Sequence, residues 1–319
     1  MSHPVVLIGE AIGDANLARL AQAYPDLEFR YCVERESYLA NVADAEIIFS
    51  KQFPPGTLER AQKLRWVQAG TAGVNHLLTA GIGERGIRLT NARGAHGTPI
   101  AEQTLALMFA FANRLPTLVR AQTVRQSVAR QVIAEKFELA GQTLCVIGLG
   151  DIGGALATKA KGLGMRVLGV RRTTTPYPGL DAQYTPAQLA EALPQADHVA
   201  LCLPLTTATT AIIGERELRL MRPTAYIYNV GRGASLEAQA LIRALQAGWI
   251  AGAGLDCTDP EPLPDDSPLW VMPNVILAQH TSGSSPYNAD RITQIFLENL
   301  HRYRRNEPLN NLVDPVQGY

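Results

Sequence analysis

Short runs of apolar residues recur along the first third of the chain, separated by longer segments of mixed character. The runs cover Val5 to Ile8, Phe29 to Val33, Ala45 to Phe49, Trp66 to Ala69 and Ile87 to Leu89. Mostly apolar runs of this length are typical of parallel strands. The intervening segments, such as residues 16–23, have the length and pattern of helices. This region therefore predicts a small doubly wound sheet.

A second series of apolar runs begins at Thr143. It covers Thr143 to Ile147, Val167 to Val170, Val199 to Leu203, Tyr226 to Tyr228, Ile250 to Leu255 and Val275 to Leu277. Helical segments lie between these runs, among them residues 235–247, for which Ser235 is the expected N-terminal cap and Gly248 the expected end. The alternation of strands and helices predicts a second α/β domain with a doubly wound parallel sheet.

The last segment of the chain, Asn288 to Arg305, has apolar residues at helical spacing with charged residues between them. We expect this helix to pack on the first domain. That domain is then discontinuous and consists of residues 1–94 and 287–319, while residues 95–286 form the second domain. In open α/β sheets ligands bind at the carboxyl ends of the strands, which predicts a ligand cleft between the two domains.

A glycine-rich turn, Gly148-Leu149-Gly150-Asp151-Ile152-Gly153, directly follows the predicted strand at residues 143–147. A helix and another strand come next, so strand, turn, helix and strand fit within roughly thirty residues, as in dinucleotide-binding units. In such a unit the first glycine permits the tight turn, the second allows a pyrophosphate to approach the backbone, and the third allows helix and strand to pack closely. The N-terminus of the helix attracts phosphate.

Composition removes several other classes of function. The chain has 319 residues, enough for two domains, and its 29 basic and 29 acidic residues cancel. A neutral chain has no electrostatic reason to bind nucleic acid or an anionic membrane. The longest apolar run, residues 105–112, is too short to span a bilayer, and the N-terminus has no signal pattern, so we expect a cytoplasmic protein. The four cysteines lack zinc-ligand spacing, and we expect reduced core residues and no metal.

Three polar residues follow separate apolar runs downstream of the glycine turn. Arg232 lies between two glycines, Glu261 lies in the proline-rich segment Asp259-Pro260-Glu261-Pro262, and His280 follows the run that ends near residue 278. An arginine can hold a carboxylate, an imidazole can transfer a proton, and a carboxylate can favour the protonated imidazole. Together with a nicotinamide cofactor, these groups form a site that reduces a keto acid.

The chain resembles the D-isomer-specific 2-hydroxyacid dehydrogenase family. The motifs that carry the resemblance are the glycine turn, Leu203-Pro204-Leu205-Thr206, Asn229-Val230-Gly231-Arg232-Gly233, Ala253-Gly254-Leu255-Asp256, Asp259-Pro260-Glu261-Pro262-Leu263-Pro264 and Gln279-His280-Thr281-Ser282-Gly283. Residues 68–74 and 101–102 match more weakly. The resemblance implies an α/β protein with two doubly wound parallel-sheet domains: a flavodoxin-like substrate domain, a Rossmann cofactor domain and an active-site cleft between them.

The same resemblance implies roles for individual residues. Arg232, Glu261 and His280 are the expected catalytic residues, and backbone N–H groups of Ala72 and Gly73 are expected to hold the substrate carboxylate together with Arg232 and His280. Cofactor contacts are expected from the glycine turn, from Arg171, Arg172 and Thr173, and from Leu203, Pro204, Thr209, Val230, Gly231, Asp256 and His280, with Asp256 near the nicotinamide ring. A homodimer formed through residues 120–138 is expected, although this segment lacks the tryptophan that many relatives carry there.

The strand at residues 167–170 bears on the choice between NADP(H) and NAD(H). NAD-specific enzymes of this architecture place a carboxylate at the end of that strand to bind the ribose hydroxyls. This chain has Val170-Arg171-Arg172-Thr173-Thr174 instead. Guanidinium and hydroxyl groups suit a 2′-phosphate, so we expect NADP(H) to be preferred, with NAD(H) also usable.

Two other functions can be weighed against the sequence, and several substrates are compatible with it. An NAD(H)-sensing corepressor of the same superfamily can retain the three polar residues, but the chain has no long disordered tail or basic patch that supports this role. A short-chain reductase needs Y-x-x-x-K, and no tyrosine here has a lysine four residues later. Substrate specificity is expected from residues 50–53, residues 71–75 and Tyr287. Glyoxylate, hydroxypyruvate and bulkier 2-keto acids all fit the motifs.

Overall fold

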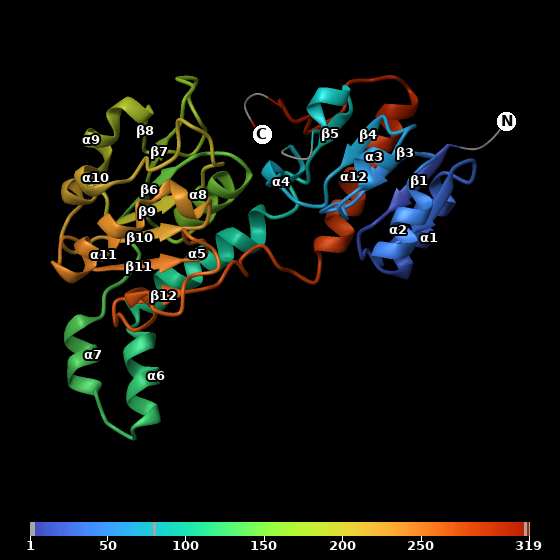
Figure 1. Ribbon diagram of the computed structural model, residues 1–319. Coiled ribbons are helices and arrows are strands. Elements are labelled where there is room, and N and C mark those ends of the chain that lie inside the picture. Colours follow the sequence, from blue (N-terminus) through green and yellow to red (C-terminus); the bar gives the residue numbers. More distant parts are fainter. Residues whose placement is uncertain (1–3, 79–80, 316–317, 319) are drawn as a thin grey trace. The chain divides into compact units, whose positions relative to one another are not determined.

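The computed structural model describes residues 4–78, 81–315 and 318. The chain divides into two compact units, Met1–His96 with Ser285–Tyr319 (unit 1) and Gly97–Ser284 (unit 2). Each unit is an open parallel β-sheet with helices packed against it (Figure 1). The predicted α/β fold class is confirmed.

Unit 1 contains a five-stranded parallel sheet in the order β2-β1-β3-β4-β5. This order is that of flavodoxin-like sheets, as expected. The strands are β1 (Val5–Ile8), β2 (Glu28–Tyr31), β3 (Ala45–Phe49), β4 (Trp66–Gln68) and β5 (Arg88–Thr90). The helices are α1 (Asp14–Ala23), α2 (Arg35–Asn41), α3 (Thr57–Arg60), α4 (Asn75–Leu78), η1 (Gly83–Arg85) and α12 (Asn288–Arg304).

Helix α12 belongs to unit 1 although it lies at the other end of the sequence. Its Phe296 is fully buried, with its ring centroid 4.6 Å from that of Phe49 on β3 and 5.4 Å from that of Trp66 on β4. The apolar stripe of the helix, including Ile292 and Leu300, completes one face of the first core. The prediction that this helix packs on the first domain is confirmed.

Unit 2 contains a seven-stranded parallel sheet in the order β12-β11-β10-β9-β6-β7-β8. Counted within the unit, this is the order of the Rossmann fold with one additional strand, β12, at the edge. The strands are β6 (Thr143–Ile147), β7 (Arg166–Val170), β8 (Ala182–Tyr184), β9 (His198–Leu201), β10 (Tyr226–Asn229), β11 (Gly252–Leu255) and β12 (Val275–Leu277). Strand β8 was not predicted, because three half-buried edge residues form no apolar run.

The helices of unit 2 cover both faces of this sheet. They are α5 (Gly97–Ala112), α6 (Leu115–Thr123), α7 (Ala129–Glu135), α8 (Asp151–Gly162), η2 (Pro186–Gln188), α9 (Leu189–Ala192), η3 (Leu193–Gln195), α10 (Glu215–Leu220), η4 (Gly233–Ser235), α11 (Ala238–Gln246) and η5 (Pro268–Trp270). Ser235 does not cap α11 as predicted: it is buried in η4, and Glu237 precedes the helix. Gly248 does end it, with a φ of 68°.

Two large tyrosines on β10 are explained by a buried aromatic and polar cluster. Tyr226 packs against Phe111 and Phe137, and the Tyr228 hydroxyl lies 3.0 Å from Nδ1 of His198. Nε2 of His198 lies 2.5 Å from the Gln142 side-chain oxygen, so Nε2 donates there and the Tyr228 hydroxyl donates to Nδ1. Burial lowers the pKa of His198 to about 4. His198 is therefore a neutral core residue at the amino end of β9.

No helix among the described residues is both long and apolar enough to cross a membrane.

Candidate functional site

The glycine turn between β6 and α8 has the backbone geometry of a dinucleotide-binding turn. Gly148 has a φ of 97°, and a Cβ there would lie 2.9 Å from the Cys202 carbonyl oxygen. A Cβ on Gly153 would lie 1.9 Å from the Gly148 carbonyl oxygen, so only glycine permits this packing of helix on strand. A Cβ on Gly150 would meet nothing within 4 Å. The turn thus presents open space at Gly150, beside the N-terminus of α8, where a pyrophosphate would bind.

The loop after β7 carries the three residues predicted to select the cofactor. Arg171 is partly buried, and its guanidinium carbon lies 5.4 Å from the ring centroid of Tyr177. Arg172 and Thr173 are exposed, and the Gln183 side chain donates a hydrogen bond to the Thr173 carbonyl. No acidic residue occurs between Arg166 and Leu180. This loop is therefore locally basic and held by its own contacts.

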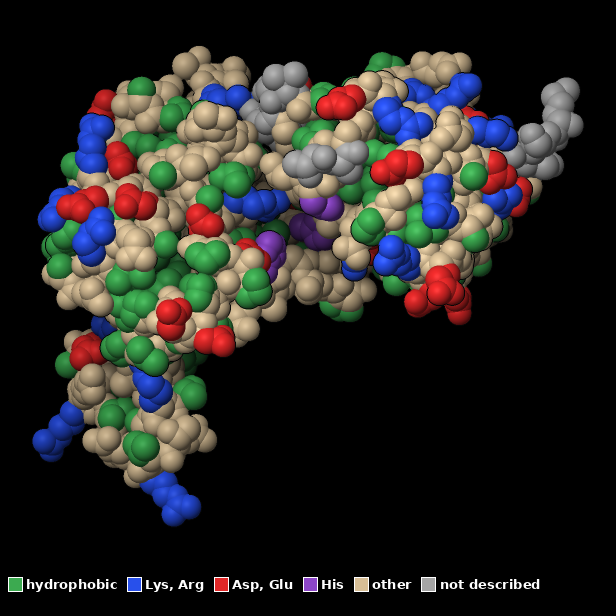
Figure 2. Space-filling model, in the orientation of Figure 1, with side chains coloured by type: hydrophobic (Ala, Val, Ile, Leu, Met, Phe, Trp, Pro, Cys, Tyr) green, Lys and Arg blue, Asp and Glu red, His purple; other side chains and the backbone are tan. Residues whose placement is uncertain are grey.

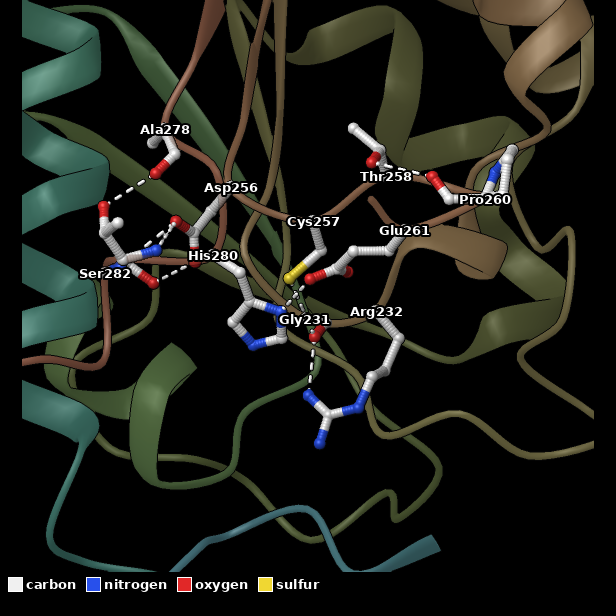
Figure 3. Close-up of polar contacts among 11 residues, drawn as sticks. Gly231, Arg232, Asp256, Cys257, Thr258, Pro260, Glu261, Ala278, His280 and Ser282 are labelled. Carbon is white, nitrogen blue, oxygen red and sulfur yellow. Dashed lines mark hydrogen bonds and ion pairs between the residues drawn. The ribbon is translucent and has the colours of Figure 1, made fainter. Parts of the chain in front are cut away.

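Strands β10, β11 and β12 are parallel neighbours, so the loops that follow them leave the same edge of the sheet. Arg232 follows β10, Glu261 lies in the loop between β11 and β12, and His280 follows β12. Figure 3 shows the Glu261 carboxylate facing the His280 ring, with the Arg232 side chain beside them. The structure thus brings together the three residues that the sequence singled out.

Glycines allow Arg232 to lie deep among these loops. A Cβ on Gly231 would lie 2.7 Å from the Leu203 carbonyl oxygen, and one on Gly233 would lie 1.8 Å from the Thr258 carbonyl oxygen. The guanidinium Nη1 donates a hydrogen bond of 2.7 Å to the Gly231 carbonyl, which leaves the rest of the fork directed away from this bond. An arginine held in this way can bind a planar carboxylate with two parallel hydrogen bonds.

His280 and Glu261 form an ion pair between His280 Nδ1 and Glu261 Oε1 (Figure 3). The side chains remain 53% and 40% exposed, so a ligand can reach the imidazole. Because Nδ1 is engaged by the carboxylate, Nε2 is the ring atom available to a substrate. An imidazole held by a carboxylate at one nitrogen can transfer a proton at the other.

The loop that carries His280 is fastened to Asp256. The backbone N–H of His280 donates to the Asp256 carbonyl at 2.6 Å, and the N–H groups of Thr281 and Ser282 donate to Asp256 Oδ1 at 2.9 and 3.1 Å. The Ser282 hydroxyl also bonds to the Asp256 carboxylate. Gln279 and His280 have φ values of 53° and 57°, a left-handed conformation that costs energy for residues other than glycine. The Asp256 contacts hold this strained loop in place.

The sequence profile described as D-isomer specific 2-hydroxyacid dehydrogenase, NAD binding domain, matches residues 105–282, more than half of the chain. A glyoxylate reductase of Korarchaeum cryptofilum is 36% identical over 288 residues, which cover 89% of this chain and 83% of that protein. The chain belongs to the D-isomer specific 2-hydroxyacid dehydrogenase family.

Two solved structures of this family resemble the present one. A D-isomer specific 2-hydroxyacid dehydrogenase family protein from Aeromonas salmonicida has a TM-score of 0.87 and 31% identity, covering 98% of this chain and 100% of that one. A D-isomer specific 2-hydroxyacid dehydrogenase from Xanthobacter autotrophicus, solved in complex with NADPH and MES, has a TM-score of 0.85 and 28% identity over 100% of both chains. The protein is therefore an NAD(P)-dependent oxidoreductase that binds a nicotinamide cofactor.

Within this dehydrogenase, the other residues expected to contact the cofactor lie in loops at the same sheet edge as the glycine turn. Leu203 and Pro204 follow β9, and Val230 and Gly231 follow β10. Thr209 has a local bonding role: its hydroxyl donates to the Pro204 carbonyl at 2.7 Å and accepts from the Thr206 N–H. These two hydrogen bonds hold the backbone of the turn after β9 in place.

Ala72 and Gly73 lie in unit 1, in the loop that follows β4. The Asn91 side chain donates to the Ala72 carbonyl at 3.0 Å, and the Thr71 hydroxyl donates to the Gly73 carbonyl at 2.9 Å. The loop is thus tied down through its carbonyl groups. In the same unit, His76 Nε2 lies 2.7 Å from the Lys51 carbonyl. His76 directly follows residues 71–75, so this contact lies between the two segments expected to set specificity.

Some features of this site differ from the sequence-based predictions or were not predicted. The run that precedes His280 is not a buried strand: β12 is an edge strand, and only its Val275 is buried. Asn229 was given no role, yet its side chain bonds to the Gly231 N–H and the Arg232 carbonyl and shapes the arginine turn. Its position at the end of β10, shortly before Gly231 and Gly233, was the available signal. Cys257 was assigned to the core, and it does lie buried beside Glu261 and His280.

Proposed function

We propose that this dehydrogenase uses NADPH to reduce glyoxylate or a related small 2-keto acid, such as hydroxypyruvate, to the D-2-hydroxy acid. The observation that carries the proposal is the grouping of Arg232, Glu261 and His280 at one sheet edge that also bears the glycine turn. The similarity to glyoxylate reductases supports the substrate class. The basic loop after β7 supports the choice of cofactor.

In this mechanism the protein positions the substrate and supplies the proton. A dinucleotide held at the glycine turn would supply the hydride for the carbonyl carbon. Arg232 binds the substrate carboxylate and stabilises negative charge on the carbonyl oxygen as it develops. Protonated His280 donates the proton of Nε2 to that oxygen, while Glu261 at Nδ1 holds the ring in orientation. In the oxidative direction, neutral His280 accepts the hydroxyl proton.

The two units have separate roles in this proposal. Unit 2 binds the cofactor and carries the three catalytic residues. Unit 1 contributes the loop at Ala72 and Gly73, whose carbonyl groups are already bonded and whose N–H groups bind the substrate carboxylate. Asp256 acts as a positioning residue through its bonds to the loop of His280.

The cofactor preference has a direct test. We expect kcat/KM for NADPH to exceed that for NADH, because Arg171 and Arg172 can pair with a 2′-phosphate. Replacing both by alanine should raise KM for NADPH by roughly ten- to hundredfold, while KM for NADH changes little. A matched control is Arg166→Ala, since Arg166 begins β7 and lies at the other end of the strand. Equal or better use of NADH by the unmodified enzyme would overturn the preference.

The substrate proposal is tested with a panel of 2-keto acids and both reduced cofactors. Glyoxylate and hydroxypyruvate are expected to give the highest kcat/KM. Efficient turnover of a bulky aryl keto acid, with glyoxylate far behind, would overturn the proposed substrate. Tight binding of NAD(H) without turnover of any 2-keto acid would instead support the corepressor alternative.

We also propose that the protein forms a homodimer through the α6 and α7 arm, residues 115–135. Figure 1 shows this helical pair projecting from unit 2, and Figure 2 shows hydrophobic side chains on its surface. Its exposed apolar residues are Leu115, Leu118, Val119, Val124 and Ile133, the last 75% exposed. Exposed apolar residues grouped in this way are typical of protein interfaces. A monomeric mass by light scattering, unchanged by Val119→Glu, would contradict this proposal.

A further inference from the structure

Cys257, Glu261 and His280 form a compact group of three potential metal ligands. The thiol sulfur, a carboxylate oxygen and a ring nitrogen all lie within 4.8 Å of one another. Among residues 4–78, 81–315 and 318, no other group of this kind occurs. Figure 3 shows the sulfur directed toward the Glu261 carboxylate and the His280 ring. Thiolate, imidazole and carboxylate are the ligands that Zn²⁺ takes in proteins.

We propose that these three residues form an inhibitory binding site for Zn²⁺ or a similarly soft divalent cation. The inhibitory effect rests on the catalytic roles proposed above for Glu261 and His280. Binding itself depends only on the three side chains, so the two proposals can fail separately.

The shape of the group suits a cation that enters from solvent. Cys257 is 3% exposed and lies on the inner side, whereas Glu261 and His280 are exposed on the outer side. Zinc bonds of about 2.0 to 2.3 Å place tetrahedral ligand atoms roughly 3.5 Å apart, so the group needs only small side-chain movements. A water molecule would supply the fourth ligand, since three protein ligands leave one position open.

A cation that binds this group must displace the thiol proton and bind close to the Arg232 guanidinium. Burial, with Asp256 and Glu261 nearby, raises the pKa of Cys257 to about 12, so the free protein holds the thiol protonated. That thiol donates a weak hydrogen bond, 3.5 Å long, to the Gly231 carbonyl, which also accepts from Arg232. On binding, the cation takes up the thiolate and the thiol proton passes to solvent. The carboxylate and the thiolate together balance the two positive charges of the cation. The bound group then has no net charge, so the nearby guanidinium does not repel it.

Inhibition follows from the atoms that the cation occupies. Bound Zn²⁺ takes Nδ1 of His280 and an oxygen of Glu261, the two atoms that form their ion pair. A metal-bound imidazole is not protonated at that nitrogen and cannot become the imidazolium that donates a proton. Reduction therefore stops while the cation is bound, and a chelator restores it.

The first experiment measures binding without substrate or cofactor. Chelator-treated protein is titrated with Co²⁺, which should give a near-ultraviolet thiolate-to-cobalt absorption band with one equivalent per chain. Zn²⁺ should then displace Co²⁺ and abolish the band. Cys257→Ala should remove the band and weaken Zn²⁺ binding by more than about tenfold. The matched control is Cys32→Ala, which removes a buried thiol in unit 1 and should leave the band intact.

The second experiment measures inhibition, with each variant compared with its own rate in the absence of metal. Micromolar Zn²⁺ should inhibit the unmodified enzyme and the Cys32→Ala variant, and Cys257→Ala should need at least tenfold more Zn²⁺ for the same fractional loss. If Cys257→Ala does not fold, Cys257→Ser preserves the volume and removes the thiolate.

The outcomes separate the two proposals. Absence of the cobalt band, or a band that survives in Cys257→Ala, overturns the metal site whatever the enzyme's substrate is. A band without any inhibition of turnover overturns the inhibitory role. A band in a protein that reduces no 2-keto acid leaves the metal site standing and contradicts the proposed function.

Discussion

The two parallel sheets differ in what their carboxyl edges present. In unit 2, the neighbouring strands β10, β11 and β12 are followed by Arg232, Asp256 and His280, so charged side chains gather at the edge. In unit 1, the loops after β4 and β5 are joined by a bond from the Asn91 side chain to the Ala72 carbonyl. In the proposed mechanism, the edge in unit 2 supplies the groups that react, and the loops after β4 and β5 in unit 1 supply an ordered backbone.

This difference predicts that substitutions of Arg232, Glu261 and His280 in unit 2 lower kcat, whereas substitutions that loosen the Ala72 loop in unit 1 raise KM for the keto acid. The largest effect is expected for Arg232→Ala. It removes both the carboxylate contact and the stabilisation of charge on the carbonyl oxygen, so kcat/KM should fall by about 10³-fold or more in steady-state assays. Arg232→Lys should restore only part, since a point charge cannot replace the planar fork. Activity of the alanine variant within tenfold of wild type would remove Arg232 from the mechanism.

His280→Ala should lower kcat for reduction by about 10²- to 10⁴-fold, because the proton donor is lost. The dissociation constant for NADPH, measured by fluorescence titration, should change little, since the side chain acts on the substrate oxygen. The control is His301→Ala, a change of an exposed histidine on α12 in unit 1. A large loss of cofactor affinity in His280→Ala would indicate that the substitution disturbs the loop conformation and does not act only by removing the proton donor.

Glu261→Gln should have a smaller effect than His280→Ala. The amide keeps nearly the same shape but loses the charged partner at His280 Nδ1, so the ring is held less firmly and kcat for reduction should fall by about tenfold. The measurement is kcat at saturating keto acid and NADPH. An unchanged kcat would show that the ion pair has no catalytic consequence.

The smallest effect is expected in unit 1. Asn91→Ala removes the hydrogen bond to the Ala72 carbonyl and loosens the loop, which should raise KM for the keto acid by about fivefold. The values of kcat and of KM for NADPH should stay close to those of the unmodified enzyme. A drop in kcat without a change in KM would break the division between the two units.

The sequence predicted much of this protein because its signals are local. The mostly apolar runs correspond to eleven of the strands that the structure describes, and the run at Thr143 to Ile147 matches β6 at both ends. The glycines at 148, 150 and 153 are required by the conformation and packing of the backbone within a few residues of each, so their roles could be predicted from their spacing. The strand β8 and the start of α11 were missed, because an edge strand lacks a full apolar run and Ser235 is buried in the turn after Arg232.

The sequence by itself determined two wound sheets, a dinucleotide-binding turn and three residues suited to keto-acid reduction. Only the tertiary structure decided which side chains meet. Asp256 and Ser282 are bonded although 26 positions separate them, and Cys257 lies beside His280 because β11 and β12 are adjacent in the sheet. Contacts of this kind depend on strand order and on loop geometry, which no local pattern encodes. Cysteine spacing along the chain therefore indicated no metal site, whereas folding brings the sulfur, the nitrogen and the carboxylate together.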